Sequence, residues 1–124
     1  VNANWALFLM VDKLLLPLNR VILHASAVIR NGEAILFTAP SGTGKSTQAS
    51  LWERHLGAEI INGDKALLLC RQQPICAAGL PYSGTSGICG NALAPVQAIV
   101  VLEQGWLQRW ARLALWRECC SCLC

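Results

Sequence analysis

The stretch Ala39-Pro40-Ser41-Gly42-Thr43-Gly44-Lys45-Ser46 decides how this chain of 124 residues is interpreted. It follows the phosphate-binding loop pattern G-x-x-x-x-G-K-[ST], with Ala39 in the place of the first glycine. Glycine tolerates backbone conformations that a side chain disfavours, so Gly42 and Gly44 allow successive N–H groups to point at one anion. Ala39 adds only a methyl group, which would be costly if that position required a positive φ.

The residues that follow the glycines carry the chemistry of this pattern. Lys45 can place a compact positive charge over the β- and γ-phosphates of a nucleotide, and the Ser46 hydroxyl can ligate Mg²⁺. A helix beginning at Lys45 would direct the positive end of its dipole toward the same phosphates. Residues 39–47, which end at Thr47, are therefore predicted to bind the phosphates of a nucleotide.

The flanking sequence supplies the setting that the pattern needs. Residues 34–38 form a short apolar run that favours a strand, and residues 46–56 read as a helix. Gly57 follows as a natural helix stop. Apolar side chains recur in that helix at i, i+3 and i+7: Ala49, Trp52 and Leu56. Strand, glycine-rich loop and helix follow one another as a phosphate-binding loop requires.

The segment before the loop predicts an unusual sheet. Residues 21–29 are rich in β-branched and aliphatic side chains, and Asn31-Gly32 is a strong signal for a tight hairpin turn. The strand that leads into the loop would then have an antiparallel neighbour directly before it in sequence. The sequence therefore predicts an α/β chain, a phosphate-loop nucleotide-binding core with a mixed, partly antiparallel sheet.

Further elements follow the same kind of signal. We expect an amphipathic core helix over residues 3–16, strands over residues 59–62 and 95–102, and extended chain over residues 66–70. Gln73-Pro74 marks a turn, after which residues 75–78 return. Residues 79–91 hold four glycines and a proline, which predicts a loop.

Composition limits the function classes. Basic residues are scattered and the net charge is +3, so no nucleic-acid footprint is expected. The apolar run of residues 5–11 is too short to span a membrane and lacks the flanks of a signal peptide. Three cysteines in the body, with no export signal, favour a reducing cytoplasm; they are Cys70, Cys76 and Cys89.

Two parts of the chain are expected, because the last stretch differs from the rest. Residues 1–105 form the predicted nucleotide-binding domain, and residues 106–124 are an atypical tail rich in Trp, Arg and Cys. The chain begins with valine, and we expect it to be an incomplete piece of a domain. The CCSCLC ending lacks the C-x₂-C pairs of zinc sites, so a tail unrelated to the fold is favoured over a metal cluster or a short helix.

Three features outside the loop could contribute chemistry. Asp64 follows an apolar strand, where a carboxylate can organise Mg²⁺, although aspartate at such a place also caps turns. Pairing around Asn31-Gly32 would set His24 opposite Ala39, close to the phosphates, although a lone strand histidine is more often a packed or surface residue. The loop of residues 79–91 could clamp a second substrate through the hydroxyls of Ser83, Thr85 and Ser86. Alternatively, this loop could be disordered.

The run LHASAVIRNGEAILFTAPSGTGKSTQASLW, residues 23–52, resembles the catalytic core of HPr kinase/phosphorylase and its kinase-like relatives. That core is structurally related to ATP-dependent phosphoenolpyruvate carboxykinase. The resemblance covers residues 20–70 well and residues 95–105 less firmly, and the segment GLPYSG of residues 79–84 looks like one in the kinase-like relatives. It implies a mixed-sheet core, use of Mg²⁺ and ATP, and phosphoryl transfer to a hydroxyl.

The resemblance also implies roles for single residues. His24 followed by Ala25 matches a histidine and small residue that begin the strand before the loop, which makes His24 a phosphate-side contact. Asp64 becomes the metal-binding or base carboxylate, together with Lys45 and Ser46. The family shows two adjacent acids at that strand end, whereas here Asp64 is followed by Lys65. Loss of a general base typically slows proton removal by about 10²-fold or more.

The sequence thus predicts a kinase-like phosphotransferase that binds Mg²⁺ and ATP. Its catalytic residues would be His24, Lys45 and Asp64, and its metal ligands Ser46 and Asp64. The acceptor is an unidentified protein, peptide or small molecule with a hydroxyl group, and no counterpart of an HPr-recognition loop is visible. A regulatory module that binds nucleotide without turnover and an inactive fragment stay open as alternatives, as does a homo-oligomer.

Overall fold

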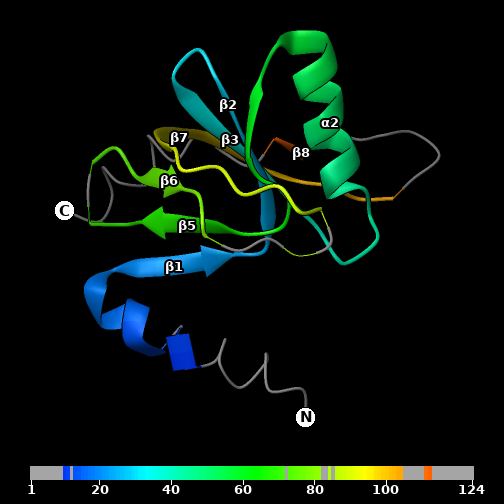
Figure 1. Ribbon diagram of the computed structural model, residues 1–124. Coiled ribbons are helices and arrows are strands. Elements are labelled where there is room, and N and C mark those ends of the chain that lie inside the picture. Colours follow the sequence, from blue (N-terminus) through cyan, green and yellow to red (C-terminus); the bar gives the residue numbers. More distant parts are fainter. Residues whose placement is uncertain are drawn as a thin grey trace.

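A mixed sheet and one long helix account for most of the described chain (Figure 1). The computed structural model describes residues 10–11, 13–71, 73–81, 84, 86–104 and 111–112. Its elements in chain order are η1 (Leu16–Leu18), β1 (Arg20–Leu23), β2 (Ala25–Arg30), β3 (Glu33–Thr38), α2 (Lys45–Leu56), β4 (Glu59–Asn62), β5 (Ala66–Leu69), β6 (Cys76–Ala78), β7 (Leu93–Val101) and β8 (Ala111–Arg112).

The sheet has the predicted mixed character. The strand order is β1-β5-β6-β7-β3-β2-β4, with β8 beside β7. β3 and β7 run parallel, while the β2–β3 hairpin and the remaining neighbours are antiparallel. The predictions of an α/β chain and of a partly antiparallel sheet are therefore confirmed.

The hairpin turn forms at the predicted dipeptide. Asn31 and Gly32 both have positive φ, 53° and 77°, as the tightest hairpin turns require. Arg30 faces Glu33 across the turn, and the register continues to Ala25 opposite Thr38. This register fixes which end of β2 lies beside the loop that follows β3.

The predicted strand of residues 21–29 is divided in two at His24. β1 pairs with β5, whereas β2 pairs with β3 and β4. The chain thus changes neighbours at His24, a change that strand propensity cannot reveal because propensity is local. His24 is left between two strands rather than inside one.

The β2–β3 hairpin is buried on both faces, and this burial forms the core. On one face, Val28, Ile35 and Phe37 pack with Ala49 of α2, and the ring of Trp52 lies 5.6 Å from that of Phe37. The opposite face packs against β5, β6 and the start of β7, mostly through small side chains: Ala25, Ala27, Ala34, Leu36, Ile61, Ala66, Ala77 and Ala94. Burial on two faces explains why β3 reads as a continuous apolar run instead of an alternating one.

One burial prediction is wrong. Residues 10, 11 and 13–15 are helical as expected, but Met10 is 65% exposed and Leu14 is 71% exposed, so this part is not a core helix. In α2, Ala49 and Trp52 pack in the core, whereas Leu56 in the last turn is 42% exposed. Residues 3–9 lie outside the described part of the chain.

The tail is described only at β8, where Ala111–Arg112 pair with β7. The cysteines predicted to form no metal site, at positions 119, 120, 122 and 124, lie outside the described residues. Within the described part, no helix is long and apolar enough to cross a membrane.

Replacing Leu36 by alanine should destabilise the fold far more than the same change at Leu93. Leu36 is fully buried in β3 and Leu93 is 58% exposed in β7. We expect Leu36→Ala to lower the free energy of unfolding by about 3 kcal/mol, and Leu93→Ala to lower it by about 0.5 kcal/mol or less. Urea unfolding followed by tryptophan fluorescence measures both. Equal losses, or a gradual transition in the unsubstituted chain, would contradict this core and favour the inactive-fragment alternative.

Candidate functional site

Two glycines of the loop between β3 and α2 have the left-handed backbone that favours glycine. Gly42 and Gly44 have φ values of 78° and 104°, and Gly44 is the N-cap of α2. A Cβ atom at Gly42 would meet nothing within 4 Å, so backbone conformation and not space explains the glycine there. Ala39 does not have a positive φ, so its departure from the glycine pattern costs no backbone strain.

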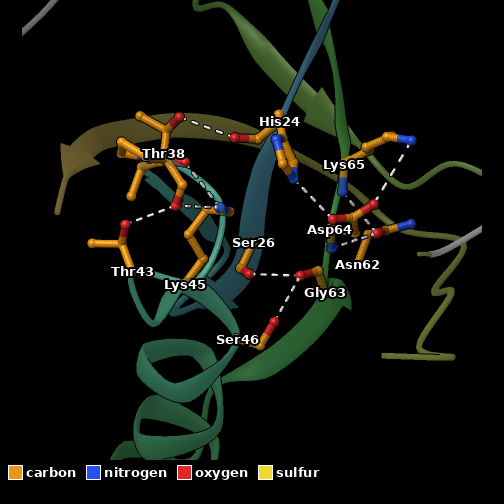
Figure 2. A network of polar contacts seen from close by, with 12 residues as sticks. His24, Ser26, Thr38, Thr43, Lys45, Ser46, Asn62, Gly63, Asp64 and Lys65 are labelled. Carbon is orange, nitrogen blue, oxygen red and sulfur yellow. Dashed lines mark hydrogen bonds and ion pairs between the residues drawn. The ribbon is translucent and has the colours of Figure 1, made fainter. Parts of the chain in front are cut away.

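Lys45 folds back into this loop. Its ammonium group donates to the carbonyl oxygens of Ala39 at 2.9 Å and Pro40 at 3.2 Å, and the residue is only 8% exposed. Thr43 donates its hydroxyl to the same Pro40 carbonyl at 2.7 Å. The positive charge is therefore held inside the loop at the N-terminus of α2, by contacts that an incoming anion can replace (Figure 2).

The end of β7 supports the loop from its other side. Leu102 donates its backbone N–H to the Thr38 carbonyl at 2.9 Å, which extends the parallel pairing of β3 and β7. The Gln104 side chain then donates to the Gly42 carbonyl at 3.2 Å. Gln104 was not predicted as a site residue from the sequence. The feature that could have identified it is its position just after the strand that runs parallel to β3.

A single carbonyl joins three elements beside the loop. The Gly63 oxygen, at the end of β4, accepts the Ser26 hydroxyl of β2 at 2.7 Å and the Ser46 hydroxyl of α2 at 3.2 Å (Figure 2). Ser26 is fully buried. These bonds place the first turn of α2 directly against the end of β4, the strand that leads to Asp64.

Asn62 shapes the turn that follows β4. Its side-chain oxygen accepts the backbone N–H of Asp64 at 2.9 Å and that of Lys65 at 3.0 Å, and its amide donates to the Leu80 carbonyl at 3.4 Å. The residue is fully buried. The turn is thus capped by Asn62, which leaves the Asp64 carboxylate for other partners. The sequence feature that could have identified Asn62 is a polar residue at the end of an apolar strand, since such a residue needs a hydrogen-bond partner when it is buried.

The Asp64 carboxylate has a cationic or hydrogen-bonding partner at each oxygen. Oδ1 lies 3.0 Å from His24 Nε2, and Oδ2 lies 3.7 Å from Lys65 Nζ. The side chains of Asp64 and Lys65 are 25% and 22% exposed, and that of His24 is 50% exposed. Because a carboxylate only accepts, Nε2 of His24 carries the hydrogen and Nδ1 keeps its lone pair when the ring is neutral.

His24 lies just beyond the end of the hairpin register. The last pair is Ala25 opposite Thr38, and His24 and Ala39 are the next residues along the chain on the two sides. The Thr38 hydroxyl donates to the His24 carbonyl at 3.0 Å and fixes the backbone there. Figure 2 shows the imidazole directed toward Asp64. His55, by contrast, lies in the last turn of α2, at the opposite end of the helix from the loop.

Part of the 79–91 loop lies on the same strand end. Gly84 approaches Asp64 so closely that a Cβ atom would overlap its carboxylate, and a Cβ atom at Gly63 would overlap Ser86. The backbone of Cys89 forms an isolated antiparallel β-bridge with that of Asn62, and Gly90 donates its N–H to the Ile61 carbonyl. Ser83 and Thr85 lie outside the described residues, so the predicted substrate clamp stays a prediction.

The two predicted metal ligands differ in how well they suit Mg²⁺. Ser46 has an exposed position and a hydroxyl oxygen of the kind that Mg²⁺ accepts. Asp64 does not fit in this arrangement, because His24 and Lys65 already face its two oxygens. Among the described residues, no group of three or more His, Cys, Asp or Glu side chains could hold a metal ion.

Comparison with known proteins adds no assignment to this geometry. No protein-family model matches the chain, and no curated protein matches it.

Proposed function

We propose that the chain binds ATP through residues 39–47 and transfers its γ-phosphoryl group to a hydroxyl group of an unidentified acceptor. The observation that carries this proposal is the position of Lys45. Its ammonium group is held inside a loop with two left-handed glycines, at the N-terminus of a twelve-residue helix whose Ser46 bonds to the residue before Asp64. The resemblance of residues 23–52 to HPr-kinase-like cores supports the same function.

Binding of the triphosphate would use groups that are already in place. The Lys45 ammonium would exchange the carbonyls of Ala39 and Pro40 for phosphate oxygens, which bear full negative charge. Backbone N–H groups at the start of α2 and the helix dipole would add to this attraction. Little ordering cost is expected, because Gln104 and Thr43 already hold the loop.

Transfer would proceed by in-line displacement at the γ-phosphorus. The bond to the β,γ-bridging oxygen breaks, a bond to the acceptor oxygen forms, and the acceptor hydroxyl loses its proton. His24 is the residue that would take this proton, at Nδ1, because Asp64 holds its other ring nitrogen. Lys45 and the loop N–H groups would stabilise the charge on the transferring group.

Mg²⁺ would be held at the Ser46 hydroxyl together with the phosphates, where it neutralises negative charge on the nucleotide when bound. We further place the protein in a reducing cytoplasm, with residues 1–105 as the nucleotide-binding unit. Three described cysteines without disulfides support that location: Cys70, Cys76 and Cys89.

One observation favours a second candidate, a module that binds nucleotide without turnover. Asp64 is the one carboxylate at the end of β4, and both of its oxygens already have partners. In such a module the bound triphosphate would order the loop and its neighbours, and no proton acceptor would be needed.

Replacing Lys45 by alanine should remove most of the affinity for ATP. We expect Kd to rise at least about tenfold, or about 1.4 kcal/mol, since the variant lacks the charge inside the loop. Isothermal titration of ATP with Mg²⁺ measures this change. Arg54→Ala, an exposed cation of the same helix, is the matched control and should bind as the unsubstituted chain does. Equal binding by the Lys45 variant in a folded protein would refute nucleotide binding at this loop.

His24→Gln and Asp64→Asn should slow phosphoryl transfer while leaving ATP binding nearly intact. Water can replace the unknown acceptor, so release of labelled phosphate from γ-labelled ATP measures the transfer step. We expect each variant to lose about 10²-fold in rate, the lower end for general-base catalysis, with Kd for ATP changed less than about threefold. Unchanged rates would exclude the pair from the reaction. Tight ATP binding with no phosphate release, with or without added hydroxyl acceptors, would support the non-catalytic module.

A further inference from the structure

The surroundings of the Asp64 carboxylate favour an ammonium group over a divalent metal ion. Asp64 follows a glycine after a strand, where the sequence predicts a metal ligand, yet its immediate neighbour in sequence is Lys65. Side chains of adjacent residues usually diverge. Here they meet, because the Asn62 side-chain oxygen accepts the backbone N–H groups of both residues and bends the chain between them.

The Lys65 ammonium lies 3.7 Å from Asp64 Oδ2, a distance typical of an ion pair rather than of a hydrogen bond. Both side chains are about three-quarters buried, so solvent screens their attraction less than it would for a fully exposed pair. The other carboxylate oxygen contacts His24, and Gly84 packs against the group from the 79–91 loop. The carboxylate is thus enclosed by three neighbours.

A divalent ion on Oδ2 would meet strong opposition from this arrangement. Mg²⁺ binds carboxylate oxygen at about 2.1 Å, which would put the ion within about 6 Å of the Lys65 ammonium. The repulsion between a single and a double positive charge at that separation lowers metal affinity by about tenfold even at the dielectric constant of water. The effect is larger where burial reduces screening.

We propose that Lys65 excludes divalent metal from Asp64 and thereby reserves this carboxylate as the partner that orients His24. Asp64 is then a positioning residue, and any metal ion at the site is held by the nucleotide and Ser46 without it. This inference extends the proposed function and rests on it for one point, the position of the reaction site beside residues 39–47. Its physical basis, the competition between an ammonium group and a divalent ion for one carboxylate, exists in the nucleotide-free chain.

Removing the Lys65 charge should therefore create metal affinity at Asp64. The probe is Mn²⁺ alone, titrated into the nucleotide-free chain and followed by electron paramagnetic resonance of the free ion. We expect Lys65→Gln to bind one Mn²⁺ at least about tenfold more tightly than the unsubstituted chain. The matched control Lys65→Arg keeps the charge and should not gain affinity. In the double variant Lys65→Gln with Asp64→Asn, the gain should disappear.

Two results would overturn the proposal. One is a Lys65→Gln variant, shown to be folded by its thermal unfolding, that binds Mn²⁺ no more tightly than the unsubstituted chain. The other is an unsubstituted chain whose Mn²⁺ affinity already falls when Asp64 is changed to Asn. Because nucleotide is absent, these outcomes do not depend on ATP binding. A failure of ATP to bind in calorimetry would sink the proposed function and leave the cation competition to be judged separately.

Discussion

Burial of the β2–β3 hairpin on both of its faces is the constraint on which the rest of the structure depends. Leu36 and Phe37, neighbours in β3, are both fully buried, one against the small side chains of β5, β6 and β7 and the other against α2. Each such side chain contributes about 1.5–3 kcal/mol when removed from water. Because the hairpin cannot shift without exposing one of these faces, its register is fixed. That register sets the loop at one end of β3 and His24 beside it.

The second organising feature is polar and lies at the end of β4. Ser26 and Asn62 are buried without charge, and burying such groups unpaired costs about 1–3 kcal/mol each. Both have hydrogen-bond partners, Ser26 in the Gly63 carbonyl and Asn62 in the turn that it caps. The Gly63 carbonyl that accepts the Ser26 hydroxyl also accepts that of Ser46, and the turn that Asn62 caps carries Asp64. Stability and the geometry of the candidate site therefore rest on shared contacts.

Asp64 illustrates how a site differs from a motif. Its position after an apolar strand suggested a metal ligand, and its adjacency to Lys65 looked like the loss of an acid. The structure shows a carboxylate with an imidazole at one oxygen and an ammonium group near the other. An ammonium group and a divalent ion compete for the same oxygen, so a substitution at one residue changes what its neighbour can bind.

Much of the local structure could be predicted from sequence because its causes are local. The glycines of the loop, the turn at Asn31-Gly32, the helix stop at Gly57 and the strand before Asp64 each follow from conformational preference or from periodicity, and each is observed. The pairing of Ala25 with Thr38, next to His24, also followed, since a two-residue turn dictates the register of its hairpin.

What only the tertiary structure decided is which distant segments meet. The change of neighbours at His24 depends on the pairing of β1 with β5. The convergence of Ser26, Ser46 and Gly63 depends on the pairing of β2 with β4 and on the bonds of both hydroxyls to the Gly63 carbonyl. Hydrophobic patterning says that a face must be covered but not by which segment, and a polar residue in a strand does not name its partner. The sequence by itself determined the loop and the elements that flank it. Packing over long separations in the chain determined what surrounds them.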